Sequence, residues 1–181
     1  MIFFEWERYD LCVNCIQEVI RYLFIDQIMN NSVKFAHTNI VADNWEKLAQ
    51  FYIDVFDCEP VYPERDMSGE WIDRITGIKD VHIKGIHLRL PGYENGPTLE
   101  IFEYEPKEKL RSKDAINQPG FAHIAFHADN VEDVLDKFLS YGGSKYGQLV
   151  EKEMEGLGIL TIIYARDPEG NIVEIQNWNV A

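Results

Sequence analysis

The chain repeats one short pattern twice, and this duplication constrains its fold more than any other feature of the sequence. The tripeptide Phe35-Ala36-His37, followed after four residues by Ala-Asp-Asn-x-Glu, returns as Phe121-Ala122-His123 with the same continuation. A second segment, Leu99-Glu100-Ile101, returns as Val173-Glu174-Ile175. Because a repeated sequence indicates a repeated structural unit, we expect two similar modules. Each has a histidine near its start and a glutamate near its end.

Each copy is expected to follow the order β-α-β-β-β. The first copy has a strand at 33–41, a helix capped by Asp43 or Asn44 that ends near Phe56, and strands at about 58–62, 81–90 and 97–104. The second copy has a strand at 121–128, a helix at 131–141, and strands at about 146–154, 157–165 and 172–178. Residues 63–80 are long, polar and charged, so we expect an excursion or lid there rather than core.

These elements divide the chain into a helical extension (1–32), module one (33–104), a linker (105–117) and module two (118–178). In the extension, apolar residues recur at helical spacing and predict one amphipathic helix from about Asp10 to Ile28. Met29 immediately precedes the first copy and is an alternative start of the chain.

Composition narrows the classes of function. The chain has 181 residues, of which 46% are hydrophobic, so a globular core is expected rather than disorder. The net charge of −14 argues against nucleic acid and anionic membranes as partners. Three sparse cysteines, Cys12, Cys15 and Cys58, do not make a disulfide framework. With no secretory signal and no apolar stretch of about 20 residues, a cytoplasmic protein is expected.

The recurrent histidines and glutamates predict a metal site. Alternate residues of a strand share a side, so a pseudo-twofold axis between the copies would pair His37 with His123 and Glu100 with Glu174. Two carboxylates and two neutral imidazoles balance the charge of a divalent ion and suit Ni, Co, Fe, Mn or Zn. On an octahedral ion, two positions would remain for substrate or water. No organic cofactor is expected.

Other titratable residues fit this site less well. His127 shares a strand face with His123 but lies about 13 Å further along the strand. His82 and His87 have no counterparts in the second copy, and each is a candidate substrate-facing group. Arg89 is a candidate anchor for an anionic substrate group, with a surface ion pair as the alternative. Trp71, in the expected lid, is a candidate substrate contact.

The motifs together resemble the vicinal oxygen chelate superfamily, which includes glyoxalase I, methylmalonyl-CoA epimerase, extradiol dioxygenases and bleomycin-resistance proteins. The resemblance covers about 33–178 and rests on four segments: Phe-Ala-His-x-x-x-x-Ala-Asp, Gly-Pro-Thr-Leu-Glu-Ile, Gly-Phe-Ala-His-Ile-Ala-Phe and Asp-Pro-Glu-Gly-Asn-x-x-Glu-Ile. It implies an α+β fold in which tandem βαβββ modules form a curved, open eight-stranded sheet around the metal. The segment 62–82 is longer than in compact glyoxalases, and the extension 1–32 is foreign to them.

The order His37, Glu100, His123, Glu174 is similar to the ligand set of bacterial glyoxalase I. The resemblance therefore implies a lyase or isomerase that moves a proton alpha to a carbonyl, with the metal stabilising the resulting enediolate. Glu174 is the expected base, and Glu100 is a ligand or acts on the other face of the substrate. The expected substrate is a small molecule with adjacent oxygens.

Two alternatives remain. The first is an iron-dependent ring-cleaving dioxygenase of the same fold, which would use a three-ligand set and tolerate loss of Glu100. The second is a non-catalytic small-molecule-binding protein similar to bleomycin-resistance proteins, which would bind its ligand without metal. Relatives commonly form homodimers, and some build each site from modules of two chains, so we expect a homodimer. The strand pattern is the same whether the two histidines meet within one chain or across two.

Overall fold

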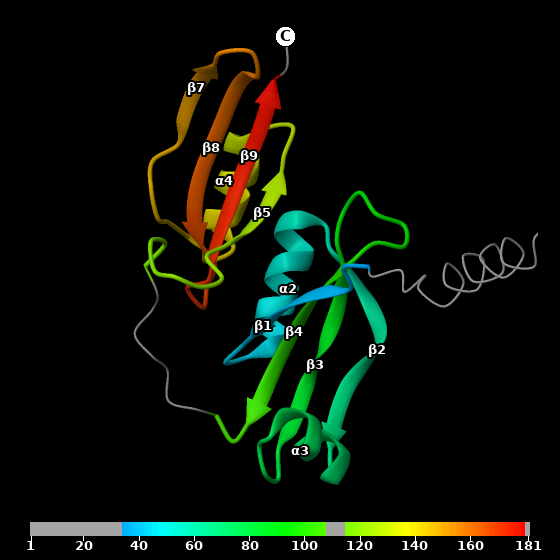
Figure 1. Cartoon of the computed structure of the whole chain (residues 1–181). Coiled ribbons are helices and arrows are strands. Elements are labelled where there is room, and N and C mark those ends of the chain that lie inside the picture. The colour runs from blue at the N-terminus through cyan, green and yellow to red at the C-terminus, as the bar shows by residue number, and fades with distance from the viewer. Residues whose placement is uncertain (1–33, 108–114, 180–181) are drawn as a thin grey trace, which may run out of the picture. The chain divides into compact units, whose positions relative to one another are not determined.

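The elements of the structure follow the repeat that is visible in the sequence. A computed structural model describes residues 34–107 and 115–179, and Ala36–Ala181 forms one compact unit (Figure 1). The expected helix at Asp10–Ile28, the pair Cys12 and Cys15, and the alternative start Met29 lie outside the described residues. The proposed domain boundaries stay a prediction.

Module one contains a helix that is capped as predicted. Its elements are β1 (His37–Val41), α2 (Trp45–Phe56), β2 (Glu59–Ser68), α3 (Glu70–Thr76), β3 (His82–Arg89) and β4 (Thr98–Glu105). The side chain of Asn44 accepts a hydrogen bond from the backbone N–H of Lys47, which satisfies one donor of the first turn of α2. One face of α2 is apolar and buried in the core, through four residues at helical spacing: Leu48, Phe51, Tyr52 and Val55.

Module two repeats this plan with a shorter helix. Its elements are β5 (Ile124–His127), α4 (Val131–Ser140), β6 (Ser144–Lys145), β7 (Val150–Met154), β8 (Gly158–Arg166) and β9 (Ile172–Asn179). Asn130 caps α4 as Asn44 caps α2, by accepting from the backbone N–H of Asp133. The strand expected at 146–154 begins only at Val150, as β7, and the short strand β6 precedes it at 144–145; both pair with β8.

The described residues contain nine strands in two open, mixed sheets, which confirms the α+β class. One sheet has the order β1-β4-β3-β2, and the other has the order β5-β9-β8-β6 with β7 also paired to β8. In each copy the first strand pairs in parallel with the last, and the remaining pairs are antiparallel (Figure 1). The first strand of each copy therefore lies beside the strand that carries the predicted glutamate.

Most of the segment 63–80, expected to be an excursion or lid rather than core, forms regular secondary structure and is exposed. Strand β2 continues to Ser68 and α3 follows directly. The sequence pattern was misleading because β2 is an edge strand with a register irregularity between Val61 and Arg65, where Pro63 and a run of charges are tolerated. Helix α3 buries Ile72 in a cluster with Val81, Ile83 and Phe102.

The main core joins the two copies through aromatic side chains. The ring of Phe56 at the end of α2 stacks on Phe126 of β5, with centroids 3.9 Å apart, and Phe51 packs edge-on against Phe138 of α4 at 5.0 Å. The buried hydroxyl of Tyr52 donates to Asp167 in the turn between β8 and β9. The two copies of one chain thus share a single hydrophobic cluster.

A second contact between the copies uses the other end of α2. The carboxylate of Glu169 accepts hydrogen bonds from the backbone N–H groups of Asp43 (2.7 Å) and Asn44 (2.9 Å). An anionic group is favourable near a helix N-terminus, where backbone N–H groups lack partners.

None of the helices in the described ranges has the length and apolar character needed to cross a membrane.

Candidate functional site

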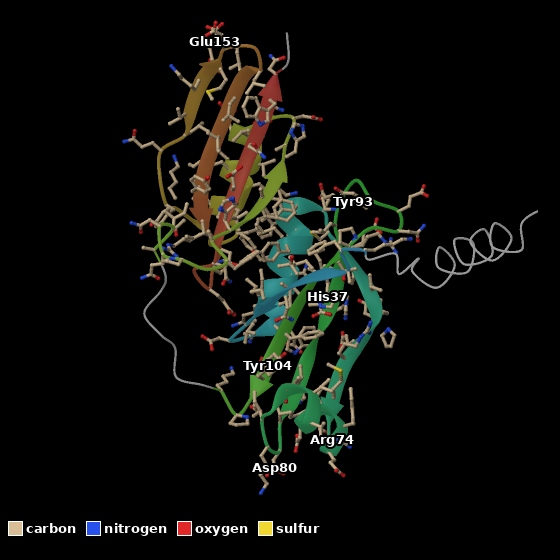
Figure 2. All side chains as sticks on the ribbon, viewed as in Figure 1. His37, Arg74, Asp80, Tyr93, Tyr104 and Glu153 are labelled. Atoms are coloured by element: carbon tan, nitrogen blue, oxygen red, sulfur yellow. The ribbon has the colours of Figure 1, made fainter. Side chains whose placement is uncertain are left out.

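The predicted ligands lie on the sheet face that points away from the main core. In β1, Ile40 is buried in that core, whereas His37, Asn39 and Val41 on the other face are exposed. The parallel pairing with β4 aligns His37 with Thr98 and Asn39 with Glu100. Figure 2 labels His37 on β1 and Tyr104 on β4 of this sheet. The local alternation of both strands therefore brings the first histidine and the first glutamate to one face.

Three side chains converge on Glu100. Its Oε1 lies 3.3 Å from Nδ1 of His37 and 3.1 Å from Nε2 of His87, and its Oε2 accepts a hydrogen bond from Nδ2 of Asn39 at 3.2 Å. Glu100 is only 8% exposed, so these partners offset much of the cost of burying a carboxylate. His37 remains about half exposed at the edge of this cluster.

Module two holds the equivalent pair with different neighbours. Nε2 of His123 lies 3.3 Å from Oε2 of Glu174, and Glu174 is 7% exposed. The ring of Tyr164 packs edge-on against His123, with centroids 5.2 Å apart. Nδ1 of His123 is the one buried side-chain nitrogen or oxygen in the described ranges that has no hydrogen-bond partner.

Strand register places two residues beside the glutamates: His87, which the sequence suggested only as a substrate-facing group, and Tyr164, which it did not suggest. His87 of β3 pairs with Glu100 of β4, and Tyr164 of β8 pairs with Glu174 of β9. Each pair flanks a hairpin turn that the sequence already marks with proline and glycine. Counting outward from the two turns would have placed His87 and Tyr164 opposite the two glutamates.

Burial and hydrogen bonding keep these neighbours uncharged near neutral pH. Burial lowers the pKa of His87, although the charge of Glu100 opposes the shift. Burial, with the charge of Glu100 in second place, raises the pKa of Tyr104. A hydrogen bond to Glu174 raises the pKa of Tyr164. His87, Tyr104 and Tyr164 therefore place no charge of their own beside the two glutamates at neutral pH.

The donor atoms suit a divalent metal in their chemistry. Two donors on one ion, each about 2.0 to 2.2 Å from it, lie about 3 Å apart, and each His–Glu pair is separated by 3.3 Å. The unpartnered Nδ1 shows that His123 is not committed to another hydrogen-bond network. Within the described residues, however, no group of three or more His, Cys, Asp or Glu side chains is arranged to hold a metal ion. The structure thus brings the four predicted ligands together as two pairs, and the four-ligand set stays a prediction.

The other candidate residues lie away from the two His–Glu pairs, and three of them have charged partners. Arg89 forms an ion pair with Glu59 on the neighbouring strand, and Trp71 lies on α3 with 56% of its surface exposed. His82 contacts Asp66 at 2.5 Å, and His127 lies 3.8 Å from Asp129. The substrate-binding roles of Arg89 and Trp71 stay predictions.

A surface hollow of about 240 Å³ lies apart from the predicted ligands. It is formed by the first turn of α2 and by residues of β3 and β4, and its lining consists of Asn44, Trp45, Glu46, His82, Lys84, Glu103 and Glu105. On β4, Glu103 lies on the strand face opposite Glu100. The hollow therefore does not include either His–Glu pair.

The sequence and this fold together define the family. Residues 34–175 match the family model of the Glyoxalase/Bleomycin resistance protein/Dioxygenase superfamily, and the chain belongs to that superfamily. The resemblance drawn from the motifs is thereby confirmed.

Among proteins of known function, the chain is similar to two from Rhodococcus globerulus. It is 28% identical over 148 residues to Biphenyl-2,3-diol 1,2-dioxygenase 2, and this alignment covers 82% of this chain and 64% of that protein. It is 39% identical over 67 residues to Biphenyl-2,3-diol 1,2-dioxygenase 3, which covers 34% of this chain and 31% of that protein. The chain thus spans less than two thirds of the length of either relative.

Solved structures support the same fold. A glyoxalase family protein from Bacillus cereus aligns with a TM-score of 0.71 at 15% identity and covers 83% of this chain and 97% of its own. A glyoxalase I variant from Zea mays aligns with a TM-score of 0.57 at 18% identity, over 86% of this chain and 48% of its own. At such identities the likeness concerns the fold alone.

Proposed function

We propose that the protein is a divalent-metal-dependent lyase or isomerase that moves a proton alpha to a carbonyl. The observation that carries this proposal is the pair of equivalent His–Glu contacts, His37–Glu100 and His123–Glu174, each 3.3 Å long and each built on a buried carboxylate. His37, Glu100, His123 and Glu174 would hold the ion. Bound there, a divalent ion supplies positive charge that stabilises negative charge developing on two adjacent substrate oxygens.

Glu174 is the proposed base. Its carboxylate is buried and contacts His123, and it lies close enough to the Tyr164 hydroxyl to raise the pKa of that tyrosine. It removes the proton from the carbon alpha to the carbonyl. Return of that proton to the neighbouring carbon gives isomerisation, and return to the same carbon gives epimerisation. Glu100, held by Asn39 and His87, remains a ligand or acts on the other face of the substrate.

A second candidate is an iron-dependent ring-cleaving dioxygenase. It is favoured by the likeness to Biphenyl-2,3-diol 1,2-dioxygenase 2 of Rhodococcus globerulus. This function would require Fe(II) and dioxygen, and His37, His123 and Glu174 would be sufficient to hold the iron. Against it stands Glu100, whose burial among three polar partners would then have no catalytic purpose.

Metal content tests the proposed site directly. Plasma mass spectrometry of the purified protein should find close to one Ni, Co, Zn, Mn or Fe per site, and His37→Ala should lose it. Glu103→Gln is the matched control, since Glu103 lies on β4 but on the opposite face and pairs with Lys107. A reconstituted wild-type protein without metal would contradict the proposal.

Two activity measurements then separate the candidates. A lyase or isomerase should exchange the substrate C–H alpha to a carbonyl with deuterium from solvent, which proton NMR detects on a panel of 2-hydroxyketones and 1,2-dicarbonyls. A dioxygenase should consume dioxygen from an electrode chamber when loaded with Fe(II) and given an aromatic vicinal diol. Oxygen uptake without proton exchange would replace the first candidate by the second.

We further propose a cytoplasmic homodimer that acts on a small molecule with adjacent oxygens. The dimer is supported by the separation of the ligands into two pairs, because a second copy can supply the pair that each half lacks. The acidic charge and sparse cysteines support the compartment.

A further inference from the structure

Module one contains a short chain of polar contacts that ends on a proposed ligand. Nδ1 of His87 lies 3.1 Å from Oγ1 of Thr98, and Nε2 of the same ring lies 3.1 Å from Oε1 of Glu100. Thr98 and Glu100 are two residues apart on β4, and His87 faces both from β3. One imidazole ring therefore bridges two positions of the neighbouring strand.

The chemistry of these groups fixes where the proton of a neutral His87 belongs. A carboxylate oxygen can only accept a hydrogen bond, so the proton must lie on Nε2, which faces Glu100. Nδ1 then accepts from the Thr98 hydroxyl, which can donate. In this tautomer the Thr98 hydroxyl donates to Nδ1 of His87, and Nε2–H of His87 donates to the Glu100 carboxylate.

Packing restrains the ring in this orientation. His87 is about four-fifths buried and packs edge-on against Phe102, with ring centroids 5.6 Å apart. It also lies edge-on to His37, at 6.1 Å. A ring held on two sides and bonded at both nitrogens can transmit its orientation to Glu100.

The same arrangement recurs in module two with another side chain. Tyr164 occupies the strand position opposite Glu174, as His87 does opposite Glu100, and its interaction with that carboxylate raises the pKa of the Tyr164 hydroxyl. We propose that His87 is a positioning residue that holds the Glu100 carboxylate in its ligand orientation, with Thr98 fixing the imidazole tautomer. This inference rests on the proposed metal site.

The test measures cobalt(II) binding to the full chain. Dissociation constants come from competition with a chromophoric chelator, and the visible spectrum of bound cobalt(II) reports its coordination. His87→Phe keeps a flat ring but removes both nitrogens, and it should weaken binding by about 10- to 100-fold, as loss of a group that orients a metal ligand does. His87→Gln keeps a donor and an acceptor and should restore most of the affinity. The control is His127→Phe, which replaces an exposed histidine of module two and should leave the cobalt(II) affinity unchanged.

Thr98→Val provides an independent check. Alone it should weaken cobalt(II) binding less than His87→Phe does, and in the His87→Phe background it should have no further effect, because both act through one contact series. If His87→Phe does not fold, the Thr98→Val and His87→Gln proteins decide the question, since wild-type affinity in Thr98→Val would overturn the inference.

The outcomes distinguish this inference from the proposed function. If the wild-type protein binds cobalt(II), His37→Ala loses it, and folded His87→Phe retains wild-type affinity and spectrum, only the role of His87 is wrong. If the wild-type protein binds no cobalt(II), or His37→Ala binds it normally, the proposed metal site fails and the role of His87 fails with it.

Discussion

The two copies share a strand register but differ in what covers the face that carries their ligands. In module one, Phe102 lies two residues after Glu100 and is buried under Ile72 of α3. In module two, the corresponding residue after Glu174 is Gln176, which accepts a hydrogen bond from Trp178. The described part of module two has α4 packed on its other face, in the main core. The two copies therefore place the predicted ligands at equivalent positions, but in the described residues only module one has a helix over this face.

The environments of the two carboxylates differ in the same way. Glu100 has nitrogen partners on both oxygens, from His37, His87 and Asn39. Glu174 has His123 and the Tyr164 hydroxyl, and the position beside it on β5 is occupied by Ala125. A carboxylate with fewer fixed partners is better able to take up a proton. The comparison therefore supports the proposal that Glu100 is the ligand and Glu174 the base.

The largest expected effect comes from replacing each of these two carboxylates by an amide, one at a time. Glu174→Gln should lower turnover by about 10²- to 10⁴-fold, the usual contribution of a general base, while largely retaining the metal. Glu100→Gln should instead weaken metal binding. Steady-state kinetics and metal analysis on the same preparations check both statements. Unchanged turnover in Glu174→Gln would remove it as the base, and full activity in Glu100→Gln would favour the dioxygenase.

Mixing two inactive proteins tests whether the modules of one chain form one site. His37→Ala damages module one, and Glu174→Gln damages module two. If each site combines module one of one chain with module two of another, a refolded mixture should regain about a quarter of wild-type activity, since half the dimers are mixed and each has one intact site. If each site lies within one chain, the mixture stays inactive. Light scattering measures whether the protein is a dimer in both cases.

The sequence predicted the shared features of the copies better than their differences. The caps Asn44 and Asn130 and the strand faces follow from local patterns, and the structure has them. The pattern predicted pairing of like residues across the copies, whereas the contacts in the structure join a histidine and a glutamate within each copy. Helix α3 could not be predicted, because seven residues with one buried apolar side chain carry almost no periodic signal. The roles of His87 and Tyr164 depend on pairing between strands, which composition and spacing within one strand do not encode.

The packing of α3 on module one should contribute measurably to the free energy of unfolding. Ile72 is 3% exposed, and Ile72→Ala should lower the free energy of unfolding by about 2 to 5 kcal/mol through lost burial and the resulting cavity. Ile75 on the same helix is 71% exposed, so Ile75→Ala is the matched control and should have an effect within about 0.5 kcal/mol. Urea unfolding followed by circular dichroism measures both. Equal effects would mean that α3 does not cover this face in solution.

The ends of the two helices differ in a titratable group. Cys58 follows α2, and burial raises the pKa of its thiol from 9.0 to about 12. Between these values the unfolded chain has lost the proton and the folded chain keeps it, so stability falls as pH rises from 9 to about 12. At pH 10.5 the loss should be about 2 kcal/mol. Cys58→Ala should flatten this part of the stability curve, and an unchanged slope would assign it to other groups.

The smallest expected effect concerns the residue after each helix that has a left-handed backbone conformation. Asp57 follows α2 with φ of 55°, and Gly142, just after α4, has φ of 97°. Asp57→Gly should stabilise the protein by about 0.5 kcal/mol, because glycine adopts this conformation without strain, although the exposed contact between Asp57 and Lys137 is lost. Gly142→Ala should lower the free energy of unfolding by about 1 kcal/mol, because alanine is strained at this positive φ. The added Cβ itself would fit, since the nearest atom, Pro168 Cγ, would be 3.8 Å away. Urea unfolding of the two variants should therefore give shifts of opposite sign. Shifts of the same sign would show that the two helix ends are not equivalent.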